Sequence, residues 1–185
     1  MNTLLIKKLE TLIQALEISG IALLLLMAYV FQFVFHELPC PLCLLQRVGF
    51  IGIACGFLLN LRFGFKPSHY AIILLFSFFT AIVALRQVAL HILPGDSGYG
   101  SAIFGLHMYT WSFIVSVLIL IFNSIILGFD GQYAIEREKI MVKRKWIMHL
   151  LLLLIAAILV NNIVSVYFEC GFMQCADNPV SYVAL

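Results

Sequence analysis

Five long apolar runs, separated by short polar segments, are the feature that most constrains how this chain can fold. Each run is long enough to cross the hydrocarbon core of a bilayer as an α-helix, which rises about 1.5 Å per residue. Only 11% of the residues are charged, against about 25% in soluble domains. The sequence therefore predicts an all-α integral membrane protein and excludes the soluble classes. The predicted spans cover residues 18–35, 42–61, 70–93, 103–127 and 146–168.

Residues 1–17 show a different pattern from the five runs. Leucine and isoleucine recur there at helical spacing among charged residues, which predicts an amphipathic helix at the membrane surface. The first apolar run is long and other runs follow it, so we interpret it as an anchor rather than a cleaved signal peptide. The predicted parts are an amphipathic helix over 1–17, a four-helix membrane core over 18–128, a basic loop over 129–145, a fifth membrane helix over 146–168 and a tail over 169–185.

Most of the positive charge falls on one side of the membrane if the chain crosses it five times. The N-terminal segment, the connection between the second and third runs and the connection between the fourth and fifth runs hold all the lysines and arginines except Arg47 and Arg86. The positive-inside rule then predicts a cytoplasmic N-terminus and a C-terminus on the outer side, which in a bacterium is the periplasm. Arg47 and Arg86 lie inside predicted spans near the outer surface, where a charge is costly and often functional. Snorkelling to the interface is the alternative explanation.

The run Cys40-Pro41-Leu42-Cys43 lies where the second span begins. Two cysteines with two residues between them can open and close a disulfide with little movement of the chain. Arg47 lies four residues after Cys43, on the same face of the predicted helix. A helix N-terminus and a nearby guanidinium both favour the reactive thiolate. The pattern indicates a redox-active pair, and a structural disulfide and half of a zinc site are the alternatives.

Cys170 and Cys175 fall on the same predicted outer side as Cys40 and Cys43. In a bacterium this side is the oxidising periplasm. A disulfide between them is sterically possible because Gly171 allows a tight turn. So short a loop would organise little structure, which favours an exchangeable pair over a structural staple. With Cys40 and Cys43 they could also supply four sulfurs to zinc, although the tail spacing is loose for such a site. The fifth cysteine, Cys55, lies in an apolar run, and we expect a buried, inert thiol.

The segment from Cys40 to Arg47 resembles the CxxCxxxR signature of the DsbB family. The run from Arg86 to Pro94 is similar to the end of that family's third span, and the run from Phe104 to Trp111 looks like the start of its fourth. The resemblance covers about residues 18–127. It implies an inner-membrane protein that passes electrons from a periplasmic thioredoxin-like oxidase to a quinone, either ubiquinone or menaquinone.

By this resemblance, Cys43 faces the quinone and Cys40 faces the second cysteine pair. Arg47 would keep Cys43 as a thiolate and polarise a quinone carbonyl, while Arg86 or His91 would help to seat the ring. The resemblance thus makes these three residues the candidate cofactor-binding residues. No metal site and no nucleic-acid partner are predicted.

The chain departs from the family pattern in two ways. The family carries its second cysteine pair in the loop between spans three and four, but residues 94–102 contain no cysteine. The family also has four spans and a cytoplasmic C-terminus. We interpret the second pair as displaced to the tail, so the candidate catalytic residues are Cys40, Cys43, Cys170 and Cys175.

Two other function classes remain open from the sequence. The chain could be a thiol carrier that works without quinone and reduces targets outside the cytoplasm. It could also be a non-enzymatic membrane subunit with structural disulfides or a metal. Reduction of quinone by the purified protein separates the first alternative from a quinone-linked oxidase. In the second alternative, Arg47→Ala should have little effect on thiol chemistry.

Overall fold

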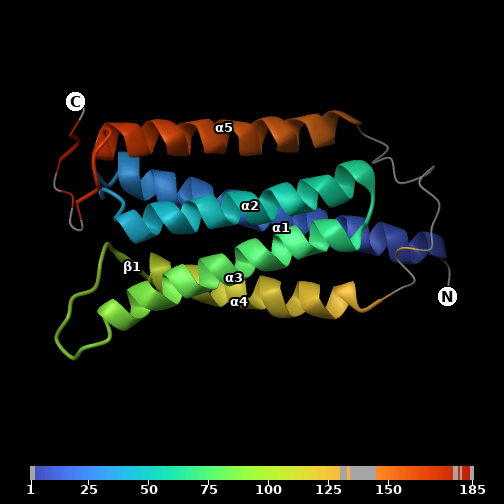
Figure 1. Cartoon of the computed structure of the whole chain (residues 1–185), viewed down its shortest axis with the longest axis horizontal. Coiled ribbons are helices and arrows are strands. Elements are labelled where there is room, and N and C mark those ends of the chain that lie inside the picture. Colours follow the sequence, from blue (N-terminus) through green and yellow to red (C-terminus); the bar gives the residue numbers. More distant parts are fainter. Residues whose placement is uncertain (1–2, 130–132, 134–144, 177–178, 180, 184–185) are drawn as a thin grey trace.

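The computed structural model describes residues 3–129, 133, 145–176, 179 and 181–183 of the chain. Within these residues the chain forms five helices, and each contains a stretch long and apolar enough to cross a membrane. The helices lie side by side in an elongated bundle (Figure 1), which confirms the predicted all-α membrane fold. They are α1 (Thr3–Phe33), α2 (Pro41–Phe63), α3 (Pro67–Leu90), α4 (Met108–Leu127) and α5 (Lys145–Cys170).

The chain alternates between the two ends of this bundle, so the N-terminus and the C-terminal tail lie at opposite ends (Figure 1). The α2–α3 turn lies at the same end as the N-terminus. The α1–α2 connection, the α3–α4 loop and the tail lie together at the other end. Both cysteine pairs come to that end, because Cys40 caps the start of α2 and Cys170 ends α5. We call it the cysteine end.

Helix α2 is the central helix of the bundle and packs against α1, α3 and α5. Phe50, Ile53 and Phe57 have no exposed surface and form the middle of the apolar core. Glycines on α2 let α3 approach closely, because a methyl group on Gly52 would collide with the Phe76 ring. Small residues allow such close packing between membrane helices. This packing sets how near the end of α3 comes to the start of α2, where the first cysteine pair lies.

Helix α1 is continuous, so the division predicted at residue 17 does not appear as a break. No proline lies between residues 3 and 33 to end the helix. Gln14, which belongs to the predicted surface segment, is buried and donates a hydrogen bond to the Tyr70 hydroxyl of α3 at 2.9 Å. The structure therefore differs from the expected separate surface helix. The cytoplasmic location of this segment stays a prediction.

The fourth membrane helix begins at Met108, later than the predicted residue 103. Residues 102–107 form a small antiparallel hairpin of β1 (Ala102–Ile103) and β2 (Leu106–His107). Phe104 and Gly105 connect the strands with φ values of 52° and 81°, which are left-handed and suit a two-residue hairpin turn. An apolar composition alone did not reveal this turn. The predicted basic loop over 129–145 lies mostly outside the described residues.

Candidate functional site

The first cysteine pair forms a disulfide at the start of α2. Cys40 is the N-cap residue, with an extended backbone (φ −72°, ψ 162°), and Pro41 occupies the first turn. Proline suits this position because its fixed φ matches a helix and its missing N–H has no helical partner there. The Cys43 N–H donates to Cys40 Sγ at 3.1 Å, and Cys40 is 5% exposed. The local geometry of a helix start thus brings the two sulfurs together.

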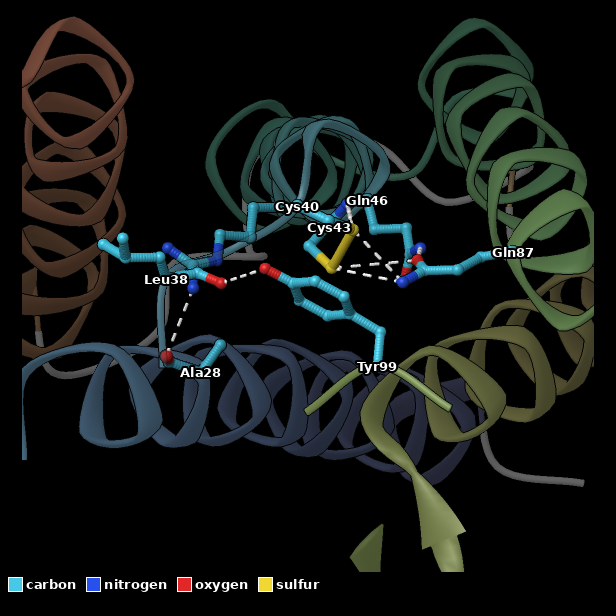
Figure 2. Close-up of a disulfide and its surroundings, with 8 residues drawn as sticks. Ala28, Leu38, Cys40, Cys43, Gln46, Gln87 and Tyr99 are labelled. Carbon is cyan, nitrogen blue, oxygen red and sulfur yellow. Dashed lines mark hydrogen bonds between the residues drawn. A yellow bond between two sulfur atoms is a disulfide. The ribbon is translucent and has the colours of Figure 1, made fainter. Parts of the chain in front are cut away.

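A glutamine from α3 contacts both sulfurs of this pair. Gln87 Nε2 donates to Cys40 Sγ at 3.1 Å and to Cys43 Sγ at 3.4 Å (Figure 2). Gln46 Nε2 in turn donates to Gln87 Oε1 at 2.7 Å. Both glutamines are buried, with exposed fractions of 1% for Gln87 and 4% for Gln46. The polar group that the sulfurs meet inside the bundle is therefore an amide.

Arg47 lies one turn after Cys43 on α2, and its guanidinium is bound by α1. Nη1 donates to Gln32 Oε1 at 2.7 Å, and Nη2 donates to the Ala28 carbonyl at 3.2 Å. The guanidinium also lies 4.8 Å from the centre of the Tyr29 ring, within the range of a cation–π interaction. Arg47 is buried, and Glu169 of α5 interacts with it electrostatically. Since an uncompensated buried charge is costly, these contacts keep a cation stable beside the disulfide.

A cavity opens between α1, α2 and α4, next to the disulfide. The space there is about 620 Å³, a figure that includes the open solvent at its mouth. Cys43, Gln46 and Arg47 line it from α2. The remaining wall is mostly apolar, with Leu24 of α1 and Met108 of α4 among its residues. The cavity thus brings together one sulfur of the Cys40–Cys43 disulfide, a guanidinium and a mostly apolar wall.

The α3–α4 loop is fastened along one side of the cavity. The Tyr99 hydroxyl donates to the Leu38 carbonyl at 2.5 Å (Figure 2). Glu37 accepts hydrogen bonds from the Ser101 N–H at 3.1 Å and from the Ser101 hydroxyl. Burial, together with the negative charges of Glu169 and Glu37, raises the pKa of Tyr99 to about 12. Tyr99 therefore stays protonated, and remains a hydrogen-bond donor, throughout the physiological pH range.

We expect Tyr99 to titrate later than an ordinary tyrosine. Its pKa in the folded protein is about 12, against an ordinary value of 10.0. The protonated hydroxyl therefore stabilises the fold fully below about pH 10, and this contribution is lost as the pH rises through about 12. The ultraviolet difference spectrum between wild type and Tyr99→Phe should show one phenolate that forms near pH 12. A phenolate that forms near pH 10 would show that Tyr99 is not held against Leu38.

The second cysteine pair forms a disulfide directly after α5. Cys170 is the last residue of the helix and is buried, whereas Cys175 is partly exposed. Gly171 has a φ of 61°, the left-handed conformation that lets the chain turn at a helix end. Phe172 and Met173, inside the ring that the disulfide closes, are 96% and 80% exposed. One sulfur of the pair thus lies against the bundle, while the ring itself is open to solvent.

Hydrogen bonds connect the tail to Arg47 through one glutamine. Gln32 Nε2 donates to Ser165 Oγ of α5 at 2.6 Å and to the Tyr182 hydroxyl of the tail at 3.2 Å. Gln32 Oε1 accepts the bond from Arg47. Glu169 is buried here too, and within the described residues neither of its carboxylate oxygens has a hydrogen-bond partner. Helix α5 and the tail are therefore part of the surroundings of Arg47.

Two of the predicted cofactor-binding residues lie away from the cavity. The Arg86 side chain is exposed on α3. His91 lies at the end of α3, where Nδ1 is 3.1 Å from Asp96 Oδ2 and the ring stacks on Tyr109 at 5.6 Å. Tyr109 lines the cavity, but Arg86 and His91 do not. Their part in quinone binding stays a prediction.

Cys55 is exposed on α2, so the prediction that its thiol is buried is wrong. Its neighbours Ala54 and Gly56 are buried, which places Cys55 on the face that turns away from the core. A long apolar run cannot distinguish a side chain that faces the core from one that faces lipid, because both environments favour apolar residues.

Gln32, Gln87 and Tyr99 are among the residues of the site that reasoning from the sequence missed. Both glutamines are polar residues within apolar runs, which is a signal of function in a membrane helix. The charge of Arg86 was the stronger signal, yet the helical phase turns Gln87 toward the sulfurs and Arg86 away. Tyr99 gave no signal, because its position depends on how the α3–α4 loop folds back on the α1–α2 connection.

One comparison with known proteins gives a match. A family model described as disulfide bond formation protein DsbB matches residues 10–101. This range includes the Cys40–Cys43 disulfide, Arg47 and Gln87, and it stops before α4. No curated protein and no solved structure matches the chain.

Proposed function

We propose an electron path for this chain, which belongs to the DsbB family of disulfide bond formation proteins. Membership makes it a multi-pass inner-membrane oxidoreductase that forms disulfides in a DsbA-like partner. In the proposed path, the reduced partner, a periplasmic thioredoxin-fold protein, gives two electrons to the Cys170–Cys175 disulfide. The electrons pass to Cys40–Cys43 and then to a membrane quinone, either ubiquinone or menaquinone. The N-terminus lies in the cytoplasm and the tail in the periplasm.

The observation that carries this proposal is the cavity beside Cys43. A quinone headgroup is a flat ring with two carbonyl oxygens, so it needs an apolar slot with a few polar groups at the edge. The cavity has a mostly apolar wall, and Gln46 and Arg47 supply polar groups next to the cysteine. The residues present fit such a ring. Arg47 and Gln46 would hold its carbonyl oxygens, and Cys43 would face it.

Each transfer between thiols in this path is a disulfide exchange. A tail thiolate attacks one sulfur of the Cys40–Cys43 disulfide, a new S–S bond forms, and the electron pair of the broken bond stays on the departing sulfur. The second tail thiol then attacks the mixed disulfide. This step restores Cys170–Cys175 and leaves Cys40 and Cys43 reduced. A bound quinone supplies the acceptor for the two electrons and two protons of that dithiol.

Arg47 contributes fixed positive charge to the cavity. Its bonds to Gln32 and Ala28 use two of the five N–H groups of a guanidinium. Because α1 holds it in place, the charge is already oriented before negative charge develops on a carbonyl oxygen. Preorganised charge of this kind stabilises a transition state without reorganisation.

Replacement of Arg47 by methionine should lower the rate of quinone reduction by roughly 10²-fold, the typical effect of losing one oriented donor. Opening of the Cys40–Cys43 disulfide by dithiothreitol should persist, since the sulfurs bond to Gln87 and not to Arg47. Arg47→Lys keeps the positive charge but lacks the planar guanidinium, so its rate of quinone reduction should lie between those of wild type and Arg47→Met. Thermal unfolding of each variant controls for the hydrogen bond that Gln32 loses. Equal rates for wild type and Arg47→Met would remove Arg47 from the proposed site.

The proposed function is tested with purified protein, a reduced thioredoxin-fold partner and a soluble quinone analogue under anaerobic conditions. We expect one quinone to be reduced for each disulfide formed in the partner, because each conversion carries two electrons. Loss of quinone absorbance measures the quinone reduced, and alkylation of the remaining partner thiols measures the disulfides formed in the partner. Oxidised partner without reduced quinone, or thiol transfer that continues when quinone is left out, would favour the quinone-independent carrier.

A further inference from the structure

The amide of Gln87 is held with its nitrogen toward the sulfurs. Its Nε2 donates to Cys40 Sγ at 3.1 Å and to Cys43 Sγ at 3.4 Å, while its Oε1 accepts from Gln46 Nε2 at 2.7 Å and lies farther, 3.7 Å, from Cys43 Sγ (Figure 2). The sulfurs of a disulfide carry no hydrogen and can only accept. If the Gln87 amide were turned over, its oxygen would face sulfur lone pairs and its NH₂ group would face the Gln46 NH₂ group. Only the observed orientation gives Gln87 hydrogen bonds both to the sulfurs and to Gln46.

We propose that Gln87 is a catalytic residue that stabilises the thiolate formed when the Cys40–Cys43 disulfide is opened. In that step an attacking thiolate bonds to one sulfur, the bond between the two sulfurs breaks, and the electron pair stays on the other sulfur. A side-chain amide has two N–H groups. Gln87 therefore has a donor for either departing sulfur, whichever one the incoming thiolate attacks.

Arg47 directs its hydrogen bonds to other groups. Its nitrogen atoms bond to Gln32 and to the Ala28 carbonyl of α1, whereas the bonds to the sulfurs come from α3. The two polar groups thus divide the work, with Gln87 acting on the sulfurs and Arg47 acting on the cavity. This inference deepens the proposed function, since it rests on disulfide exchange at Cys40–Cys43, but it does not depend on a quinone.

The test measures how readily dithiothreitol opens the Cys40–Cys43 disulfide in the full-length protein, with alkylation and mass spectrometry to follow this pair separately from Cys170–Cys175. Gln87→Met keeps a similar volume and removes both donors. We expect it to slow opening by about 10- to 100-fold, the effect of losing a hydrogen bond to a charged group. The equilibrium with glutathione should shift in the same direction, toward the disulfide.

Gln87→Met leaves Gln46 Nε2 without its buried acceptor, which could destabilise the fold on its own. The double variant Gln46→Met/Gln87→Met removes both partners, a change that is often close to neutral for stability, and it should show the same slow opening. Ser77→Ala is the matched control, because Ser77 is a buried polar residue on the same helix, nearly three turns from Gln87. It should open at the wild-type rate.

The outcome separates this inference from the proposed function. If the single and the double variant both open at the wild-type rate while Arg47→Met opens slowly, the thiolate is stabilised by Arg47 and the inference is overturned. If the wild type reduces no quinone but Gln87→Met still opens slowly, the inference stands and the quinone path fails.

Discussion

A variant in which serine replaces Cys43 is expected to reduce no measurable quinone, whichever thiol donor is supplied. Cys43 is the cysteine that lines the cavity. Without the Cys43 thiol, Cys40 cannot close the Cys40–Cys43 disulfide, so the pair cannot release two electrons. Removal of the reacting group from a covalent mechanism lowers rates by roughly 10⁴-fold or more. The measurement is quinone absorbance under anaerobic conditions, with purified protein and excess dithiothreitol.

Cys55→Ser is the matched control for this experiment. Cys55 is a thiol on the same helix, but it is exposed and does not line the cavity. The control should therefore reduce quinone at the wild-type rate. Activity that survives in Cys43→Ser but disappears in Cys55→Ser would show that the proposed path assigns the reacting thiol to the wrong cysteine.

The double variant Cys170→Ser/Cys175→Ser is expected to lose oxidation of the thioredoxin-fold partner by roughly 10²-fold or more, because the first exchange of the path has no disulfide to attack. Quinone reduction driven by dithiothreitol should remain close to wild type, since a small thiol can reach Cys40–Cys43 directly. The informative result is that activity is lost with the thioredoxin-fold partner as donor but kept with dithiothreitol. It is measured by supplying each donor to the same preparation.

Gln174→Ser is a suitable control, because Gln174 lies inside the ring of the tail disulfide and is exposed. This variant keeps both cysteines and should oxidise the partner normally. Undiminished partner oxidation by the double variant would mean that the tail disulfide is structural and that the partner attacks Cys40–Cys43 itself.

The five spans could be predicted from the sequence because the cost of burying backbone polar groups in lipid demands long, uninterrupted apolar helices. The details at the helix ends could not. The start of α4 depends on the turn at Phe104 and Gly105, whose left-handed backbone has no counterpart in hydropathy. The continuity of α1 depends on contacts such as that between Gln14 and Tyr70, which join residues far apart in the chain.

The site was predictable where its residues are close in sequence. Cys40, Cys43 and Arg47 fall within two turns at the start of α2, so spacing alone relates them. Gln87 comes from another helix, and its importance depends on a rotation of α3 that an apolar run does not reveal. The sequence could indicate that polar residues in this span matter, but not that Gln87, rather than Arg86, faces the sulfurs.

Helix α5 and the tail lie beyond the matched range of residues 10–101, yet they contribute to the same site. Ser165 and Tyr182 bind Gln32, and Glu169 interacts electrostatically with Arg47. The added helix is therefore packed into the bundle at the cysteine end. Both cysteine pairs therefore lie at the same end of the bundle, as the proposed exchange between them requires.

The proposed electron path requires above all that the tail and the first cysteine pair face the same compartment outside the cytoplasm. Intact cells can be treated with a membrane-impermeant reductant and then a membrane-impermeant maleimide, with mass spectrometry of the tail peptide as the measurement. We expect Cys175 to be modified without permeabilisation, and a cysteine introduced by Asn2→Cys to be modified only after it. Modification of Cys175 only after permeabilisation would contradict the path, because a cytoplasmic tail could not exchange with Cys40–Cys43.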